Sequence, residues 1–371
     1  MRICHVVETA GGGSGGVVVT LAKGQIRRGH EVSVIYSPKR AEPAFVEALS
    51  AIEGLRLITV GMSRAIGLHD IRSAIDLYRT MRDEGPFDII HSHSSKAGAL
   101  SRLVGVLLSS RQIYTPHAFI TMSQDGKAYH RYIERALSYL CDKVIAVSEK
   151  ERTHGISFGI SSHKIEVVSN GIEIGGFSER ASARARMGWA ESDFIIGFVG
   201  RLVPQKNPCR AVEAVAPLLK ENRDSRFVIV GDGPLWDQVV EKVAELDLDD
   251  RVVMQGSMSA REVIAGFDCV LCTSDYEGLA LVMLEALAAG VPILSTPVGG
   301  VDEAIVAGST GLVAETPSTE QLTSILRRFA ALTPEERGNM SRACLDLAQR
   351  YSTDEMIRKY ETVYMSHIGA G

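Results

Sequence analysis

Residues 2–36 read RICHVVETAGGGSGGVVVTLAKGQIRRGHEVSVIY, and this stretch decides the fold that we predict. β-Branched residues dominate Arg2–Val7 and Glu31–Tyr36, which favours two strands, and Val17–Arg28 between them has a helical pattern. A glycine-rich loop, Gly11–Gly16, joins the first strand to this helix. Strand, helix and strand in this order predict a parallel sheet whose neighbouring strands are connected by helices.

The same alternation continues along the chain. Further strands of the first half are expected at Arg56–Val60, Asp88–His91, Gln112–Thr115, Lys143–Val147 and Val167–Asn170. After a linker in Ile174–Glu191, strands recur at Phe194–Val199, Arg226–Val230, Arg251–Gln255, Cys269–Thr273 and Pro292–Ser295, with a helix over Cys209–Glu221. We therefore predict an α/β protein with two Rossmann-like, doubly wound domains that face each other across a cleft.

The domain boundaries follow from this alternation. We expect one domain over residues 1–175, a second over 176–350, and a C-terminal helix in 351–371 that packs back on the first domain. A length of 371 residues suits two domains of middling size.

The charge of the chain limits its partners. A net charge of −5 argues against nucleic-acid binding, which favours a basic surface. Residues 1–180 carry a net charge of +4 and the remainder −9. This asymmetry is consistent with a first half that faces an anionic lipid or acceptor, and equally with ordinary scatter.

Neither the cysteines nor the apolar runs indicate a redox, zinc-binding or membrane-spanning protein. Cys269 and Cys272 form C-x-x-C within a predicted buried strand, where residues three apart point to opposite faces, so we reject a redox or zinc pair. The longest apolar run, Gly278–Val298, is interrupted by Glu285, Gly290 and Pro292 and is interpreted as a buried helix followed by a strand. We expect a cytoplasmic protein, with peripheral contact to the inner face of the cytoplasmic membrane left open.

The glycine run satisfies the dinucleotide fingerprint G-x-G-x-x-G with Gly11, Gly13 and Gly16. The second strand, however, is followed by Lys39 and Arg40 rather than by an acid that would bind a ribose. An NADP-dependent oxidoreductase, whose 2′-phosphate these cations would hold, is one alternative. The preferred interpretation is a loop whose bare backbone lets an anionic ligand approach closely.

Two cations follow the strand Phe194–Val199, in the segment Gly200–Asn207. Arg201 and Lys206 at a strand end are suited to neutralise a pyrophosphate, and the departure of a diphosphate is easier when its charge is stabilised. Two solvated surface cations are the alternative.

The most specific motif is the glutamate pair in SDYEGLALVMLEA, residues 274–286. Glu277 lies in a loop after a predicted strand, where it can accept hydroxyls of a sugar. Glu285 lies on a helix expected to begin at Leu279 or Ala280, whose start offers free N–H groups to a phosphate. Because this helix is otherwise apolar, Glu285 is expected to bind a ligand such as a ribose.

Histidines follow two strands of the first half. His117 lies just past Gln112–Thr115, where its ring can bind a sugar hydroxyl or serve a structural role. His91 and His93 share a strand face, and a three-histidine metal site with His117 is the less favoured alternative, so we predict no metal. Asp247-Leu248-Asp249 resembles a metal-diphosphate motif, but it lies in a polar loop and is interpreted as solvated surface.

A basic face with interleaved aromatic residues is expected on the helix within Ser123–Ser138. Its cations are Lys127, Arg131 and Arg135. Such a face suits docking to a membrane interface and an anionic lipid acceptor, with an ordinary surface helix as the alternative.

Together these motifs resemble those of family 4 of the retaining glycosyltransferases, which have the two-Rossmann GT-B architecture. The resemblance runs nearly from end to end. It rests on Gly11–Gly16, His91–Gly98, Thr115–His117, Val147–Glu149, Asn170–Ile172, Gly200-Arg201 with Lys206, Gly231–Pro234 and Glu277–Glu285. The His91–Gly98 and Thr115–His117 motifs are similar to those of the branch that builds capsule, exopolysaccharide and O-antigen repeats, and they add Lys96 to the expected acceptor side. Ala280 and Ala118 replace the proline or glycine that many relatives have.

The resemblance implies a role for each motif. Arg201 and Lys206 would hold the donor diphosphate, Glu277 would bind the donor sugar, and His117 would lie beside it. The remaining donor contacts would come from the ribose ligand Glu285 and from the backbone near Gly13, Gly15, Gly16, Gly256, Gly278, Leu279 and Ala280. The family transfers sugar with retention and without metal or cofactor, since the nucleotide-sugar is a co-substrate.

The leading hypothesis is thus transfer from a nucleotide-sugar, expected to be a UDP-sugar, to a lipid-linked saccharide in cell-surface polysaccharide synthesis. A nucleotide-sugar 2-epimerase of the same architecture, a catalytically idle subunit and the NADP enzyme are the alternatives.

Overall fold

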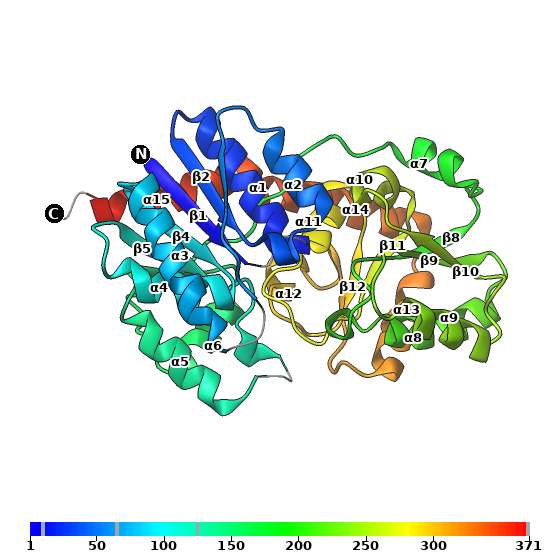
Figure 1. Ribbon diagram of the computed structural model, residues 1–371. Helices are drawn as coiled ribbons and strands as arrows, with labels where there is room; N and C mark the ends of the chain where they lie inside the picture. The colour runs from blue at the N-terminus through cyan, green and yellow to red at the C-terminus, as the bar shows by residue number, and fades with distance from the viewer. Residues whose placement is uncertain (9–11, 64–66, 124–125, 369–371) are drawn as a thin grey trace. The chain divides into compact units, whose positions relative to one another are not determined.

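The computed structural model describes residues 1–8, 12–63, 67–123 and 126–368, which form two compact units (Figure 1). The first unit contains Met1–Gly171 and the chain from Thr353 onward, and the second contains Ile172–Ser352. Each unit has one parallel sheet flanked by helices, so the predicted class of two Rossmann-like α/β domains is confirmed.

The first sheet has the strand order β3-β2-β1-β4-β5-β6-β7. Its strands are β1 (Arg2–Val7), β2 (Glu31–Tyr36), β3 (Arg56–Thr59), β4 (Ile89–His93), β5 (Arg111–Thr115), β6 (Lys143–Ala146) and β7 (Ile165–Val167). The helices of this unit are α1 (Gly12–Arg27), α2 (Pro43–Ser50), α3 (His69–Glu84), α4 (Ser95–Gly105), α5 (Ala128–Ser138), α6 (Glu149–Ser157) and α15 (Thr353–Ile368).

The alternating residues of β1 separate the two faces of this sheet. Cys4 and Val6 pack with α3 and α4, whereas Val7 packs with α1 and α2 on the opposite face. The C-terminal helix α15 contacts α1, and Arg28 Nη1, one residue after α1 ends, lies 3.2 Å from Glu361 Oε2. Because His5 points to the same face as Val7, it lies under α1 and α15.

The second sheet has the strand order β10-β9-β8-β11-β12-β13. Its strands are β8 (Phe194–Val199), β9 (Ser225–Val230), β10 (Val252–Gly256), β11 (Cys269–Cys272), β12 (Ile293–Ser295) and β13 (Gly311–Val313). The helices are α7 (Arg180–Met187), α8 (Pro208–Glu221), α9 (Trp236–Glu245), α10 (Ala260–Val263), α11 (Leu281–Ala288), α12 (Val301–Ala304), α13 (Thr319–Ala330) and α14 (Pro334–Ala348). The core of one face joins β8, β9 and β11 to α8, α9 and α13.

Three local predictions were wrong. The glycines from Gly12 onward form the first turns of α1 rather than a loop, because Val17, Val18, Leu21 and Ala22 bury this helix on the sheet and packing outweighs the poor helix propensity of glycine. The last strand of the first sheet is Ile165–Val167 rather than Val167–Asn170, since Ile165 pairs with Val144 of β6. The expected linker contains the helix α7.

Candidate active site

The second sheet changes direction between β8 and β11. The chain leaves β8 toward β9 and β10, and it returns on the other side of β8 at β11. At such a switch point the loops after two neighbouring strands diverge and leave room for a ligand. The loop after β8 carries Arg201 and Lys206, and the loop after β11 carries Glu277.

Lys206 and Glu277 meet at this switch point. Lys206 Nζ lies 2.6 Å from Glu277 Oε1, and the two side chains are 21% and 8% exposed. Gln205 Nε2 donates to the Tyr276 carbonyl oxygen at 3.0 Å, which ties the two loops together beside the ion pair. The structure therefore brings together two residues that the sequence selected separately.

A second ion pair, which was not predicted, supports the first. Arg210 Nη1 lies 2.7 Å from Asp275 Oδ1, and the Asp275 N–H donates to the Gln205 carbonyl oxygen at 2.8 Å. Arg210 belongs to α8, whose first turn is capped by the Asn207 side chain directly after Lys206. This arrangement fixes the turn that presents Lys206.

Arg201 and Glu285 flank this pair in the sequence. Arg201 is exposed, and its loop is anchored by the Leu202 N–H, which donates to the Asp232 carbonyl oxygen at 2.9 Å. Glu285 is half-buried on α11, where burial raises the pKa of its carboxyl group and the charges of Arg261 and Lys206 lower it. A carboxylate in such surroundings is suited to accept the hydroxyls of a ligand.

The backbone of residues 278–280 leads into α11. Gly278, Leu279 and Ala280 are buried, and the helix begins at Leu281, one or two residues later than predicted. The early N–H groups of α11 thus follow directly on the loop that holds Glu277.

Two glycines explain how the neighbouring loops pack so closely. A Cβ atom on Gly299, which follows β12, would lie 2.0 Å from the Glu277 carbonyl oxygen. A Cβ atom on Gly231, which follows β9, would lie 2.0 Å from the Gly200 carbonyl oxygen. The Gly231 N–H also donates to the Gly256 carbonyl oxygen at 2.8 Å, which positions Gly256, one of the expected donor contacts. Only glycine therefore permits these loops to support Glu277 and Arg201.

We expect Gly299→Ala to destabilise the second unit by about 1–3 kcal/mol, because the new methyl group collides with backbone rather than with a flexible side chain. Thermal unfolding followed by the fluorescence of Trp189 and Trp236, which both belong to the second unit, measures this change. Gly338→Ala in α14 is the matched control, since its Cβ atom meets nothing within 4 Å. An unchanged midpoint for Gly299→Ala would refute the packing argument.

In the first unit, His117 lies in a strained turn after β5. Its φ angle is 53° and that of Ala118 is 78°, a left-handed conformation that side-chain-bearing residues rarely adopt. The Ala118 N–H donates to Glu151 Oε1 at 2.6 Å, and the Val147 N–H donates to Glu151 Oε2 at 2.7 Å. Glu151 is buried, and this burial raises the pKa of its carboxyl group to about 7, although the hydrogen bonds from these N–H groups lower it.

Glu151, in the first turn of α6, and Glu8, directly after β1, are buried carboxylates that were not predicted. Glu151 belongs to a charged run of a helix, which resembles a solvated face, and nothing in its local pattern reveals that it turns inward. Glu8, which is 2% exposed, directly follows the apolar strand β1, and this position was an available signal.

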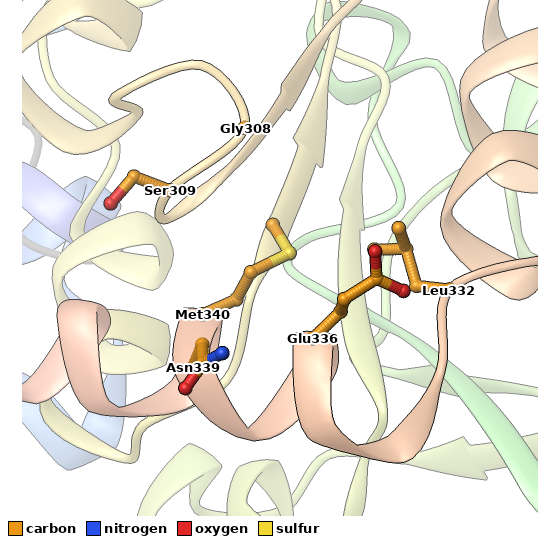
Figure 2. Close-up of a pocket in the computed structure, with 6 residues that line it drawn as sticks. All are labelled: Gly308, Ser309, Leu332, Glu336, Asn339 and Met340. Atoms are coloured by element: carbon orange, nitrogen blue, oxygen red, sulfur yellow. The ribbon is translucent and has the colours of Figure 1, made fainter.

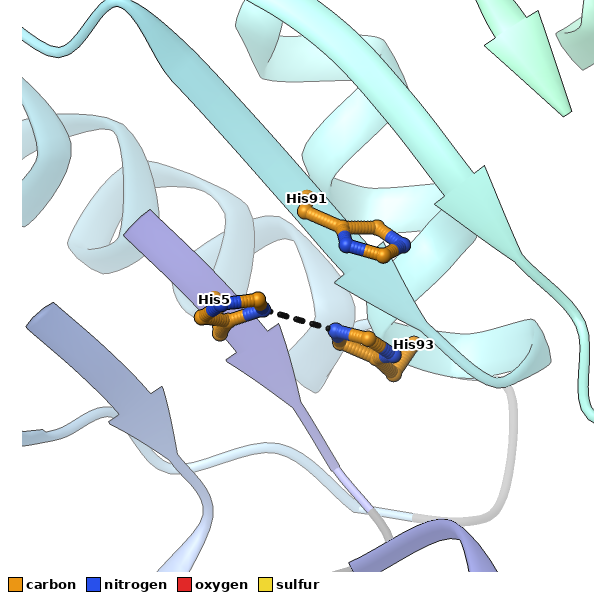
Figure 3. Close-up of side chains that lie close together, drawn as sticks. All are labelled: His5, His91 and His93. Atoms are coloured by element: carbon orange, nitrogen blue, oxygen red, sulfur yellow. Dashed lines mark hydrogen bonds between the residues drawn. The ribbon is translucent and has the colours of Figure 1, made fainter. Parts of the chain in front are cut away.

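Four histidines cluster at the carboxyl ends of β1, β4 and β5. Figure 3 shows His5, His91 and His93 on two neighbouring strands, with His5 Nδ1 2.9 Å from His93 Nε2. His93 Nδ1 lies 3.0 Å from His117 Nε2. One ring nitrogen from each of His5, His91 and His93 lies within 4.8 Å of the other two, so the group nearest to a metal site includes His5 in place of His117.

The predicted acceptor-side cations have different environments. Lys96, at the start of α4, forms an ion pair with Asp70 Oδ2 at 2.5 Å and is mostly buried. Lys127, Arg131 and Arg135 are exposed along α5. Gly13, Gly15 and Gly16 lie in α1, and Gly15 is buried, while Gly11 lies outside the described residues. Asp247 and Asp249 are exposed, as the surface interpretation requires.

A pocket at the amino-terminal edge of the second sheet is separate from these residues. This pocket of about 310 Å³ is lined by Gly308 and Ser309, which precede β13, and by residues before or early in α14 (Figure 2). In a parallel sheet the segment before a strand lies at the amino-terminal edge, opposite the switch point. Pocket shape alone thus does not identify the candidate site.

Comparison with known proteins agrees with the fold. Residues 11–175 match the family model described as Glycosyltransferase Family 4, and residues 179–344 match the one described as Glycosyl transferases group 1. The Anabaena protein HepE, solved with UDP and glucose, superposes with a TM-score of 0.85 at 20% identity over 99% of this chain and 100% of that one.

Among proteins of assigned function, a D-inositol 3-phosphate glycosyltransferase of Kineococcus radiotolerans is 30% identical over 336 residues, covering 81% of this chain and 76% of the relative. An Escherichia coli UDP-Gal:alpha-D-GlcNAc-diphosphoundecaprenol alpha-1,3-galactosyltransferase is 28% identical over 246 residues, covering 63% of each. The fold is that of a GT-B enzyme. The chain belongs to glycosyltransferase family 4, the retaining enzymes that use nucleotide-sugars, and this membership decides against the NADP-dependent oxidoreductase.

Proposed function

We propose that this enzyme transfers a sugar from a UDP-sugar to a lipid-linked saccharide during cell-surface polysaccharide synthesis. The observation that carries the proposal is the Lys206–Glu277 ion pair at the switch point of the second sheet. This pair places a cation that can bind a phosphate next to a carboxylate that can bind sugar hydroxyls. A nucleotide-sugar carries a phosphate and a hydroxyl on adjacent carbon atoms of its sugar.

The donor-binding roles follow from this placement. Lys206 and Arg201 bind the diphosphate, and Glu277 binds the sugar, with help from the backbone of residues 278–280. Glu285 accepts the ribose hydroxyls, and Gly256 borders the base. In this assignment the second unit binds the donor, while the first unit, with the helix α15, binds the acceptor.

The transfer itself requires no carboxylate nucleophile. In front-face attack, the bond between the sugar C1 and the diphosphate oxygen breaks, and a bond from C1 to the acceptor oxygen forms on the same face. The acceptor's proton passes to the departing phosphate oxygen. Lys206 and Arg201 stabilise the charge that develops on the diphosphate, and His117 binds a hydroxyl of the sugar being transferred. Two glutamates that bind hydroxyls suffice for this chemistry.

The relatives support both the base and the acceptor of the proposal. The E. coli relative is named for a UDP-galactose donor and a diphosphoundecaprenol acceptor, and the HepE structure contains UDP. A thermal-shift screen against UDP-, GDP-, ADP- and TDP-sugars tests the donor, because a bound ligand stabilises the folded state by mass action. Stabilisation by a UDP-sugar is expected. Stabilisation by one of the other nucleotide-sugars alone would refute the UDP assignment.

A surface on α4 and α5 is suited to the membrane that holds such an acceptor. No helix among the described residues has the length and apolar character needed to cross a bilayer. The α4–α5 surface exposes large apolar side chains beside the cations of α5. These side chains are Leu103, Val106, Leu107, Tyr129, Tyr132, Ile133 and Tyr139. Aromatic and aliphatic groups next to cations match the interface of an anionic bilayer.

We expect the double variant Arg131→Glu/Tyr132→Ser to reduce binding to vesicles containing anionic phosphatidylglycerol by about 10-fold or more, since each cation near such a surface contributes roughly 1 kcal/mol. Co-sedimentation with these vesicles measures the effect. Arg328→Glu/Val240→Ser, at exposed positions of the second unit, is the matched control. Equal binding of the wild type to neutral phosphatidylcholine vesicles would exclude the charge-dependent docking.

A further inference from the structure

A row of hydrogen bonds connects α1 to His117 through the interior of the first unit. Gln25 Oε1 lies 2.8 Å from His5 Nε2, His5 Nδ1 lies 2.9 Å from His93 Nε2, and His93 Nδ1 lies 3.0 Å from His117 Nε2. Gln25, His5 and His93 have no exposed surface, whereas His117 is half-buried. Each link joins one nitrogen of a ring to the next residue, so the row has one end inside the fold and one end at the surface.

The position of one proton in this row determines the positions of the others. A neutral imidazole has one N–H donor and one bare acceptor nitrogen. The Gln25 amide is oriented with Oε1 toward His5. In this orientation the oxygen only accepts, so His5 Nε2 carries a proton and His5 Nδ1 is bare. His93 Nε2 must then donate to His5, which leaves His93 Nδ1 bare, and His117 Nε2 must in turn donate to His93. His117 Nδ1 is therefore the bare nitrogen.

The burial of the row keeps the rings neutral. Burial lowers the pKa of His5 and of His117 to about 4, and it lowers the pKa of His93 well below its ordinary value. Near neutral pH each ring thus has a single proton, as the ordered row requires. No hydrogen bond to His117 Nδ1 is found among the described residues, so this nitrogen is available to a ligand.

We propose that Gln25, His5 and His93 are positioning residues, which hold His117 with its proton on Nε2 and present Nδ1 as the acceptor for a hydroxyl of the transferred sugar. The inference rests on the proposed function for the role of His117. The direction of the row follows from the orientation of the Gln25 amide, whose Oε1 faces His5.

A metal ion is a poorer explanation of the same cluster. His91, the third member of the group, is saturated by hydroxyl groups, with Tyr364 Oη 2.7 Å from its Nδ1 and Thr115 Oγ1 2.8 Å from its Nε2. Both nitrogens of His5 and of His93 are also engaged in the row. A metal would have to replace these hydrogen bonds at a place with no exposed surface.

Long-range ¹H–¹⁵N NMR of the full chain, labelled at its ten histidines, tests the proton positions without any donor. We expect His117, assigned by comparison with His117→Gln, to show a protonated Nε2 and a bare Nδ1. A protonated Nδ1 or a charged ring near neutral pH would overturn the inference. Displacement of the histidine signals by stoichiometric Zn²⁺ would also overturn it in favour of a metal site.

Three variants separate the row from a general effect on packing. The side-chain amide of Asn at position 93 reaches the place of His Nδ1, and that of Gln reaches the place of Nε2. His93→Asn is therefore expected to keep a bond to His117 but to lose the link to His5. Because either end of the Asn amide can face His117, a mixture of His117 tautomers is expected. His93→Gln keeps the link to His5 and loses the bond to His117. Gln25→Met removes the accepting oxygen three links away, and a mixture of His117 tautomers is expected. An unchanged His117 signal in both His93→Gln and Gln25→Met would contradict the proposal, and thermal midpoints identify any variant that fails to fold.

Turnover separates this inference from the proposed function. With UDP release from UDP-glucose, UDP-galactose and UDP-N-acetylglucosamine as the measure, His93→Gln is expected to lower kcat about 100-fold with a smaller change in KM, because the sugar loses its positioned acceptor. Wild-type tautomers as predicted, without release of UDP from any of these donors, would count against the proposed function only. Turnover by wild type that His93→Gln leaves unchanged would overturn the inference.

Discussion

Lys206→Met is expected to reduce sugar transfer about 1,000-fold, the largest effect that we predict for a single residue. Mutations that remove one preorganised group from a developing negative charge typically lower kcat by roughly 100- to 1,000-fold. Lys206 also neutralises Glu277, so its loss leaves a nearly buried carboxylate beside the donor sugar. Initial rates of UDP release at saturating donor, together with the thermal midpoint, measure both consequences.

The orphaned carboxylate is a second cause of lost activity that a control must remove. The double variant Lys206→Met/Glu277→Gln leaves no buried charge, and we expect its stability to recover while its activity does not. Lys220→Ala, at an exposed position on α8, is the matched lysine control and should behave as wild type. Activity of Lys206→Met within a few-fold of wild type would eliminate this residue from the donor site.

The first unit is expected to lose several kcal/mol of stability on acidification from about pH 7 to pH 5. The folded-state pKa values of His5, His91, His93 and His117 are lowered below the ordinary 6.5. The unfolded chain therefore binds more protons as pH falls from about 6.5 toward 4, and each fully titrating histidine removes at most about 1.4 kcal/mol per pH unit.

Glu151 acts in the opposite sense. Its folded-state pKa of about 7 exceeds the ordinary 4.5, so its contribution to stability is greatest below 4.5 and is lost as pH rises to about 7. Four histidines outweigh one carboxyl group, and the net effect is destabilisation by acid.

Hydrogen exchange of the β1 and β4 amides at graded pH measures the stability of the first unit. The fluorescence of Trp189 and Trp236 reports the second unit independently. His91→Gln removes one titrating ring outside the row that leads to His117, and it should reduce the pH slope. A first unit that is equally stable at both pH values would contradict the assignment of neutral buried histidines.

Most strands of both sheets were predictable because β-branched runs between helical patterns have few other interpretations. The exception in the second sheet is β13 (Gly311–Val313), a strand of three residues that was not predicted. The ends of the helices and strands were less predictable. The glycines of α1 favour a loop by propensity, and only burial of the following valines extends the helix back to Gly12. Similarly, the pairing of Val144 with Ile165 places the last strand of the first sheet, and no local pattern contains that register.

The candidate site was predictable in its residue types and less so in its contacts. Lys206 and Glu277 were selected as separate ligands of a donor, whereas the structure pairs them with each other. His5 and Glu151 were missed because their significance depends on what they touch. His5 is a polar residue within the apolar strand β1, and this was the signal available for it. Glu151 belongs to a charged segment of α6, and nothing in that segment distinguishes it from solvent-exposed neighbours.

The ion pair between Lys206 and Glu277 has a consequence for the order of events in catalysis. Before a ligand binds, Lys206 and Glu277 are each other's counter-ions. A ligand that separates them must therefore offer a new partner to each, or it leaves one charge unpaired. An intact nucleotide-sugar offers both, with phosphate for the lysine and hydroxyls for the glutamate. Free UDP offers only the first partner and leaves the glutamate without a cation. In the proposed reaction, the re-formation of this internal pair therefore favours release of the spent nucleotide over its retention.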